Sequence, residues 1–146
     1  MKFSLISDSE REDEVVVYAS EENELVKAIR ALCEGENDKT LVGYDGSEIY
    51  KISYNDVICF VSENDRLYAY LSDVKLRIKS RLYQIEEELP PSFIRINQSC
   101  VANVSMIERF DASFSGTLGV VFKNGYRDYV SRRNLKKVKE RVGLKK

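Results

Sequence analysis

The sequence predicts a mostly β (α+β) fold in which short antiparallel strands form small packed sheets. Short stretches rich in β-branched and aromatic side chains recur along the chain. Most neighbouring stretches are separated by a few polar turn residues, which is the connection that antiparallel strands need. Amphipathic helical spacing is confined to residues 20–34, 81–89 and 131–142. Strands are therefore expected to dominate.

The first 39 residues are expected to form an acidic extension that contains one strand and one helix. Residues 14–19 hold the β-branched run Val15-Val16-Val17, which is typical of a strand. Ser20 then offers an N-cap, and Gly35 suits the C-terminal cap. The apolar stripe of the helix is made of Leu25, Val26, Ile29, Leu32 and Cys33. The apolar face must pack on something: either on a second copy, which makes the extension a unit for dimerisation or regulation apart from residues 40–146, or on the domain's own sheet.

Two hairpins are predicted in the next part of the chain. Residues 40–44 and 48–52 flank Asp45-Gly46-Ser47, and residues 57–62 and 66–71 flank Glu63-Asn64-Asp65. Both connecting triplets are rich in residues that tolerate turn conformations.

Residues 74–80 alternate strictly between polar and apolar side chains, which predicts a strand. Lys75, Arg77 and Lys79 share one face, and Arg81 begins a short helix over 81–89. Such a pattern is more typical of a solvated sheet face than of a binding surface. Both interpretations stay open.

The C-terminal part is predicted to contain further strands and a closing helix. Strands are expected near 93–96, 106–112 and 117–122, and Lys123-Asn124-Gly125-Tyr126 is a strong hairpin signal leading to 127–130. Ser131 is expected to cap a final helix that Gly143 closes.

The composition offers no parts for catalysis. The chain has no histidine, and its seven glycines form no phosphate-binding loop. No acidic run has the spacing of a calcium loop. The protein is therefore expected to be no enzyme, with no cofactor, metal site or evident small-molecule substrate.

A cytoplasmic location is expected from three features. No apolar run approaches the roughly 18–20 residues that cross a bilayer. The N-terminus lacks the apolar region of a signal peptide. Cys33, Cys59 and Cys100 are widely spaced among apolar residues, so they are expected to be buried, reduced thiols.

The net charge of −1 conceals a strong asymmetry. Residues 1–48 contain 13 acidic and 5 basic residues, whereas residues from Arg95 onward contain 4 acidic and 12 basic residues. The potential that attracts a charged ligand is local, so the C-terminal part can favour an anionic partner.

Polar and basic residues gather in three places of this C-terminal part and its neighbouring hairpin. Asn97-Gln98-Ser99 form a polar tip beside Arg95, and Asp65-Arg66 form another. Asn and Ser also commonly close their own turns, which is the simpler interpretation. The last helix begins with Ser131-Arg132-Arg133 and continues to Lys136. Cations in a first helical turn oppose the helix dipole, and Arg suits guanine and phosphate, so this end is a candidate DNA contact.

These motifs resemble those of the LytTR DNA-binding domains, a family of bacterial transcription regulators. The resemblance covers about residues 40–143. The matching positions are Phe93, Arg95, Ser99, Asn103, Asn124-Gly125, Val130-Ser131-Arg132 and Lys136. It implies short antiparallel strands in small packed sheets, and DNA contacted by loops rather than by a recognition helix.

The resemblance also implies contact residues. They map onto Asp65 and Arg66, onto Asn97, Gln98 and Ser99, and onto Arg133 with Ser131 beside it. Arg95, Arg132 and Lys136 complete the candidate DNA-binding set. Two departures matter: the family often has His at the position of Asn97, and an acid at position 65 repels phosphate although it can accept from cytosine N4.

The resemblance is to family members that act alone, without a receiver domain. For such a regulator it implies three partners: double-stranded DNA with tandem half-sites, a second copy of the chain in a homodimer, and a membrane protein that regulates it. A module that binds an acidic protein or an anionic surface, without sequence-specific DNA recognition, is the competing function.

Overall fold

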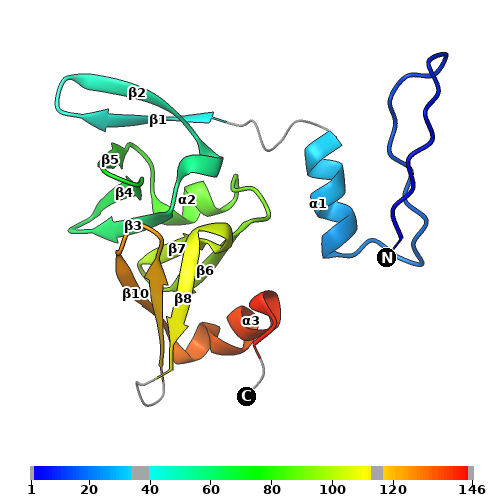
Figure 1. Cartoon of the computed structure of the whole chain (residues 1–146). Helices are drawn as coiled ribbons and strands as arrows, with labels where there is room; N and C mark the ends of the chain where they lie inside the picture. The colour runs from blue at the N-terminus through cyan, green and yellow to red at the C-terminus, as the bar shows by residue number, and fades with distance from the viewer. Residues whose placement is uncertain (1, 34–39, 113–116, 145–146) are drawn as a thin grey trace.

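The computed structural model describes residues 2–33, 40–112 and 117–144, and these form two antiparallel sheets and three α-helices (Figure 1). The helices are α1 (Glu24–Cys33), α2 (Leu82–Glu86) and α3 (Arg132–Val142). The strands are β1 (Thr40–Asp45), β2 (Glu48–Ser53), β3 (Cys59–Glu63), β4 (Arg66–Tyr70), β5 (Lys75–Ile78), β6 (Phe93–Asn97), β7 (Cys100–Asn103), β8 (Ile107–Asp111), β9 (Leu118–Phe122) and β10 (Arg127–Val130). The predicted mostly β fold with antiparallel pairing is confirmed.

A seven-stranded sheet and a three-stranded sheet make up the body. The larger sheet has the order β2-β1-β5-β4-β3-β7-β6, and the smaller has the order β10-β9-β8. Every hairpin predicted from the turn residues is formed. The β3–β4 turn is tighter than expected, because Glu63 pairs with Arg66 and only Asn64 and Asp65 lie between them. Both have positive φ angles, 50° and 63°, as a type I′ turn requires.

The core has two halves, one on each face of the larger sheet. Phe60, Leu76 and Phe93 pack on one face together with α2. On the other face, Ile96 packs with Phe122 of the smaller sheet and Val138 of α3, and all three are fully buried. The β5 alternation is confirmed, since Leu76 and Ile78 are buried while the lysine and arginine side chains between and beside them are exposed.

The strand predicted at residues 14–19 is wrong. This segment forms no strand in the described chain, and Val15 and Tyr18 are 61% and 95% exposed. An extended segment becomes a strand only when a neighbour accepts and donates its backbone hydrogen bonds. Figure 1 shows residues before α1 as a long excursion beside the helix and away from both sheets. The β-branched run therefore has no sheet partner among residues 2–33, 40–112 and 117–144.

The predicted helix of the extension is confirmed as α1, with a later start. Asn23 rather than Ser20 caps it, because the Val26 N–H donates to the Asn23 side-chain oxygen at 3.0 Å. The expected cap Gly35 lies outside the described residues. Ala31 is the residue of α1 that is buried, whereas Leu25 and Leu32 remain 46% and 65% exposed.

The three cysteines do not share one environment. Cys59 and Cys100 are buried free thiols, as predicted, but Cys33 is exposed at the end of α1, so that part of the prediction is wrong. The apolar neighbours of Cys33 lie on a helix that the body covers only in part. Among the described residues, no helix is long and apolar enough to cross a membrane.

Candidate nucleic-acid interface

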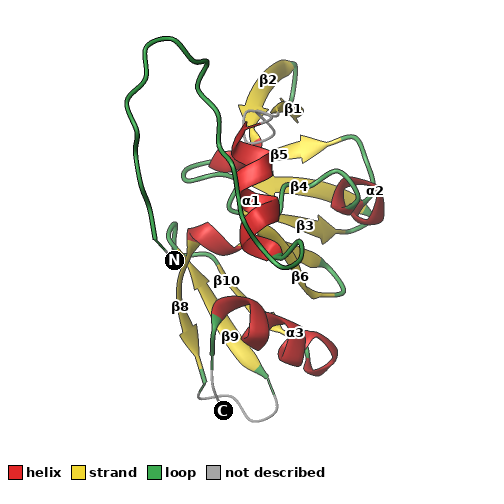
Figure 2. Cartoon of the chain, turned by 90° about the vertical axis from the view of Figure 1, so that its right-hand side faces the viewer, coloured by secondary structure: helices red, strands yellow, loops and turns green. Residues whose placement is uncertain are grey.

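Three segments that are distant in the sequence meet at one edge of the fold. The Ser62 N–H, just before the β3–β4 turn, donates to the Ser99 carbonyl of the β6–β7 turn at 2.8 Å. The Ser131 N–H, at the start of α3, donates to the Ile96 carbonyl at 2.9 Å. In Figure 2 this edge lies toward the right-hand side. We call the β3–β4 turn, the β6–β7 turn and the first turn of α3 the contact edge.

A hollow of about 650 Å³ opens between the β6–β7 turn and α3. Its lining combines cations, amides and one carboxylate, which is a composition that suits a polar, anionic ligand. The lining residues are Glu86, Arg95, Asn97, Gln98, Tyr129, Ser131, Arg133, Asn134 and Lys137. The fold thus brings together five residues that the sequence predicted as candidates: Arg95, Asn97, Gln98, Ser131 and Arg133.

Asn97 differs most from its prediction. The sequence placed it on an exposed polar tip, but its side chain is 2% exposed. Its Nδ2 donates to Asp128 Oδ1 and to the Tyr129 carbonyl, both at 2.8 Å, and its Oδ1 accepts from the Ser99 N–H at 2.8 Å. The amide therefore fastens the β6–β7 turn to β10, and little of it is exposed at the hollow. The bond to the Ser99 N–H also closes the turn, as the simpler interpretation of this residue holds.

Arg95 is half-buried and holds the same turn from the other side. Its Nε donates to the Asn97 carbonyl at 3.0 Å, and a terminal nitrogen donates to the Gln98 carbonyl. The other terminal nitrogen pairs with Glu86 of α2 at 2.8 Å. The guanidinium thus makes three internal contacts at the border of the hollow, and a contact of Arg95 with DNA stays a prediction.

Gln98 and Ser99 form the exposed part of the tip. Their backbone is held by the internal bonds of Asn97 and Arg95, so both side chains project from a fixed turn. A pre-shaped turn loses little conformational freedom when its side chains bind a ligand.

The first turn of α3 presents its cations outward. Val138 is fully buried, which sets the inner side of α3 and leaves Arg132, Arg133 and Lys136 exposed. Ser131 occupies the N-cap position as predicted, but its hydroxyl makes no cap hydrogen bond to the backbone. Its Oγ instead accepts from Asn134 Nδ2 at 2.8 Å. The Asn134 N–H in turn donates to the Ser131 carbonyl at 3.0 Å, which closes the first turn of the helix.

Asp65 and Arg66 are exposed on the neighbouring hairpin tip, outside the hollow. The Ser62–Ser99 hydrogen bond places this tip beside Gln98 and Ser99. The sequence alone does not show whether the β3–β4 and β6–β7 turns lie on the same side of the molecule. In the structure they do.

The sequence interpretation missed the support beneath the edge. Tyr126 donates its hydroxyl to Asp128 Oδ2 at 2.9 Å, and Asp128 Oδ1 accepts from Asn97. Burial and, second, the Asp128 carboxylate raise the pKa of Tyr126 well above its usual value. The hairpin signal placed residues 127–130 on a strand, but nothing in the spacing marked Tyr129, which lines the hollow, or linked Asp128 to Asn97. Across the described ranges, no group of three or more Cys, Asp or Glu side chains is arranged to hold a metal ion.

Comparison with known proteins gives a consistent result. Residues 47–143 match the family model described as the LytTr DNA-binding domain. The chain is 36% identical over 146 residues to an uncharacterized HTH-type transcriptional regulator of Staphylococcus aureus (strain NCTC 8325), with 99% of both chains covered. A counterpart in strain MSSA476 is equally similar, at 36% identity and 99% coverage of both chains.

A solved structure has the same fold. It is the LytTr DNA-binding domain of a putative methyl-accepting/DNA response regulator from Bacillus cereus, with a TM-score of 0.68 and 21% identity. The alignment covers 71% of this chain and 96% of that one. The relatives' names mention a helix-turn-helix, but in the described residues five strands separate α2 from α3. A helix pair joined by a short turn is therefore not what presents the contact edge.

Proposed function

This chain belongs to the LytTR DNA-binding domain family, and we propose that it is a transcription regulator that reads duplex DNA sequence through the contact edge. Three exposed segments held together by backbone hydrogen bonds form one edge, and the hollow beside it carries cations and amides. That convergence is the observation that carries the proposal. The family and the names of the relatives are those of DNA-binding regulators rather than enzymes.

Each residue of the edge has a proposed role. Arg133 reads a base, because an exposed guanidinium can donate two hydrogen bonds to guanine O6 and N7. Gln98 and Ser99 contact base edges or sugar–phosphate groups from the fixed turn. Arg66, Arg132 and Lys136 approach phosphates, as does the Ser131 end of α3. Arg95 and Asn97 position the β6–β7 turn. Asp65 is proposed to lie beside the DNA without contacting phosphate, because its carboxylate repels phosphate.

The competing function is binding of an acidic protein or an anionic surface without sequence recognition. Salt dependence alone does not separate the two, since both are electrostatic. A competition assay separates them. Binding of the protein to promoter fragments from its own upstream region is measured in the presence of excess random duplex at 50–200 mM salt. We expect the specific fragment to resist competition by roughly 10³-fold or more. Equal competition by both duplexes would reject sequence-specific regulation.

The N-terminal segment is proposed to pair two copies on tandem half-sites. Leu25 and Leu32 stay exposed on α1, where they border a hollow of about 410 Å³ beside Pro91. The run Val15-Val16-Val17 pairs with no strand in the described part of its own chain. Apolar surface of this kind is stabilised by a partner, and a second copy supplies identical segments. Residues 1–39 also carry 11 acidic and 5 basic residues, so they repel DNA.

The protein is further proposed to act in the cytoplasm, where its DNA is found. A membrane-protein regulator remains part of the proposal as the source of the controlling signal. Its binding surface would be the exposed N-terminal segment rather than the contact edge, because the edge is committed to DNA.

A further inference from the structure

One basic surface lies outside the contact edge. On β4 and β5, Tyr68 pairs with Arg77, and on β1 Tyr44 also pairs with Arg77. Directly paired residues of neighbouring strands point to the same face of a sheet. Arg77 therefore lies between two tyrosines, with Lys75 and Lys79 on the same face two residues away on either side. We call Arg77, Lys79 and Arg66, with Tyr44 and Tyr68, the sheet patch.

The aromatic rings hold the cations in place. The Lys79 ammonium lies 4.1 Å from the centre of the Tyr44 ring, and the Lys75 ammonium lies 4.8 Å from that of Tyr68. These are cation–π distances. A charge fixed in this way sits on a rigid strand and loses little freedom on binding.

The charge of the face is uneven. Lys75 pairs with Glu63 at 3.1 Å, so its charge is largely balanced. The same Glu63 accepts the Tyr70 hydroxyl, and that bond is the main cause lowering the pKa of Glu63. By contrast, Arg66, Arg77 and Lys79 are exposed and have no carboxylate at ion-pair distance within the described parts of the chain. Three uncompensated cations remain.

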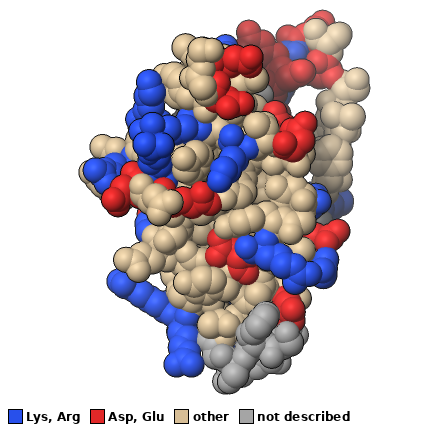
Figure 3. Space-filling model, turned by 90° about the vertical axis from the view of Figure 1, so that its left-hand side faces the viewer, with Lys and Arg blue, Asp and Glu red and all other residues tan. Residues whose placement is uncertain are grey.

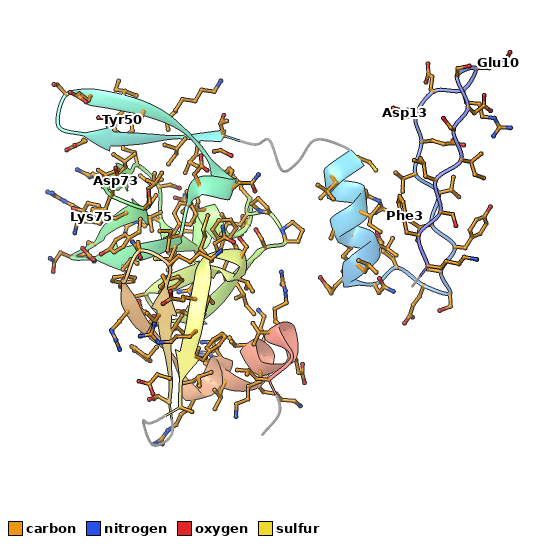
Figure 4. The ribbon with its side chains drawn as sticks, viewed as in Figure 1. Phe3, Glu10, Asp13, Tyr50, Asp73 and Lys75 are labelled. Atoms are coloured by element: carbon orange, nitrogen blue, oxygen red, sulfur yellow. The ribbon has the colours of Figure 1, made fainter. Side chains whose placement is uncertain are left out.

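These cations lie toward the contact edge. Leu67, the residue after Arg66, pairs with Ile78, so Lys79 continues β5 past the end where the β3–β4 turn lies. Figure 4 places Lys75 on the side of the larger sheet away from α1. Figure 3 faces that side and shows Lys and Arg side chains in its upper left and lower left parts, with Asp, Glu and other side chains between them. Arg66, beside the β3–β4 turn, is the residue that joins the patch to the contact edge.

We infer that the sheet patch binds phosphates of the DNA that flanks the sequence read by the contact edge. This inference rests on the proposed function and adds a second, sequence-independent footprint to it. Duplex DNA carries one negative charge per about 1.7 Å of its axis, so DNA leaving the edge brings phosphates past a neighbouring cation cluster. The patch has exposed cations on the face of a sheet, which suits phosphate contact rather than base readout.

The test compares Arg77→Gln/Lys79→Gln in the full chain with the matched control Lys123→Gln. Lys123 is an exposed lysine in the β9–β10 turn, and β10 leads from that turn to the contact edge, so Lys123 lies at the opposite end. The operator is selected from random duplexes by the parental protein. Binding is then measured to the selected core alone and to the core with added flanks, across a range of salt.

We expect the double variant to lose the gain in affinity that flanks give the parental protein. Its salt slope on the long duplex should fall by about two units, one for each phosphate contact removed. The preference for operator over random sequence should stay, and Lys79→Arg should behave as the parental protein. The control should change the slope by no more than a small fraction of a unit.

Other outcomes overturn the inference in distinguishable ways. If the parental protein selects no sequence, the proposed function fails first. If it selects one and the double variant keeps the parental salt slope on the long duplex, only the sheet patch is wrong. If that slope is kept while binding to vesicles of anionic lipid or to an acidic polypeptide is lost, the patch serves that partner instead of DNA.

Discussion

Asn97 and Gln98 are neighbours in the sequence but have opposite environments. The Asn97 amide is buried and has three hydrogen-bond partners, whereas Gln98 is exposed beside the hollow. Two amides that look equivalent in a polar tip therefore have separate tasks. One sets the shape of the turn, and the other is free to contact a ligand. Substitution can separate the two.

Asn97→Ala should lower the free energy of unfolding by about 2–4 kcal/mol, because it removes the three part-buried hydrogen bonds of a buried amide. Gln98→Ala should change it by no more than about 0.5 kcal/mol. Urea unfolding measures both, and operator binding is measured on the folded proteins. A stable Asn97→Ala variant would show that the turn is held in another way.

Arg133→Ala should weaken operator binding by about 1–3 kcal/mol and relax the preference at one base pair. The reason is the loss of a bidentate contact that only guanine accepts. Arg109→Ala is the control, since Arg109 is an exposed arginine that pairs with Glu108 on β8. Binding to the operator and to all its single-base variants gives the result. Unchanged affinity and unchanged base preference would remove Arg133 from the interface.

The β1–β2 hairpin depends on a close approach to β5. Gly43 of β1 faces Leu76, and a β-carbon at Gly43 would lie 2.8 Å from the Leu76 β-carbon. The two strands share the single pair Tyr44–Arg77. A glycine at this point lets the outer hairpin complete the sheet and brings Tyr44 to the sheet patch.

Gly43→Ala should lower the free energy of unfolding by about 1–3 kcal/mol, because the added methyl group overpacks against Leu76. Ser47→Ala, in the exposed β1–β2 turn, is the control and should be close to neutral. Denaturant unfolding followed by circular dichroism checks both. Equal stabilities of the two variants would mean that β1 can shift away from β5 at little cost.

The described chain divides into a packed body and an N-terminal segment with exposed apolar residues. Phe3, Leu5 and Ile6 are each more than 80% exposed, and so is Tyr18 after the valine run. The body, in contrast, buries its apolar residues in two clusters. The apolar side chains of the N-terminal segment would be buried if a second copy packed against them, as proposed above.

Deleting residues 1–39 should convert a dimer into a monomer that still binds a half-site weakly. The body retains its two sheets and contact edge, while the apolar surface proposed to pair two copies is lost. Sedimentation measures the mass, and binding to one and two half-sites measures the consequence. If the truncated chain keeps the mass and operator affinity of the full chain, residues 1–39 have no pairing role.

The sequence by itself determined the strands of the body. Alternation along 74–80 fixes which side chains of β5 face the core, because successive residues of a strand point to opposite faces. Glycine and asparagine at the turns fix where hairpins close, because few other residues adopt positive φ at low cost. These are local effects, and local effects can be read from neighbouring residues. The polar tip, the basic start of the last helix and the LytTR resemblance were likewise found from local patterns in the sequence.

The tertiary structure decided which of those residues can meet a ligand. Asn97 is turned inward because Asp128 and the Tyr129 carbonyl lie beside it, more than 30 positions away in the chain. The valine run forms no strand because none of the described residues pairs with it, although its composition favours a strand. Burial and pairing depend on partners that are remote in the sequence. For that reason the sequence predicted five residues that line the hollow, but it did not predict the burial of Asn97 or the internal bonds of Arg95.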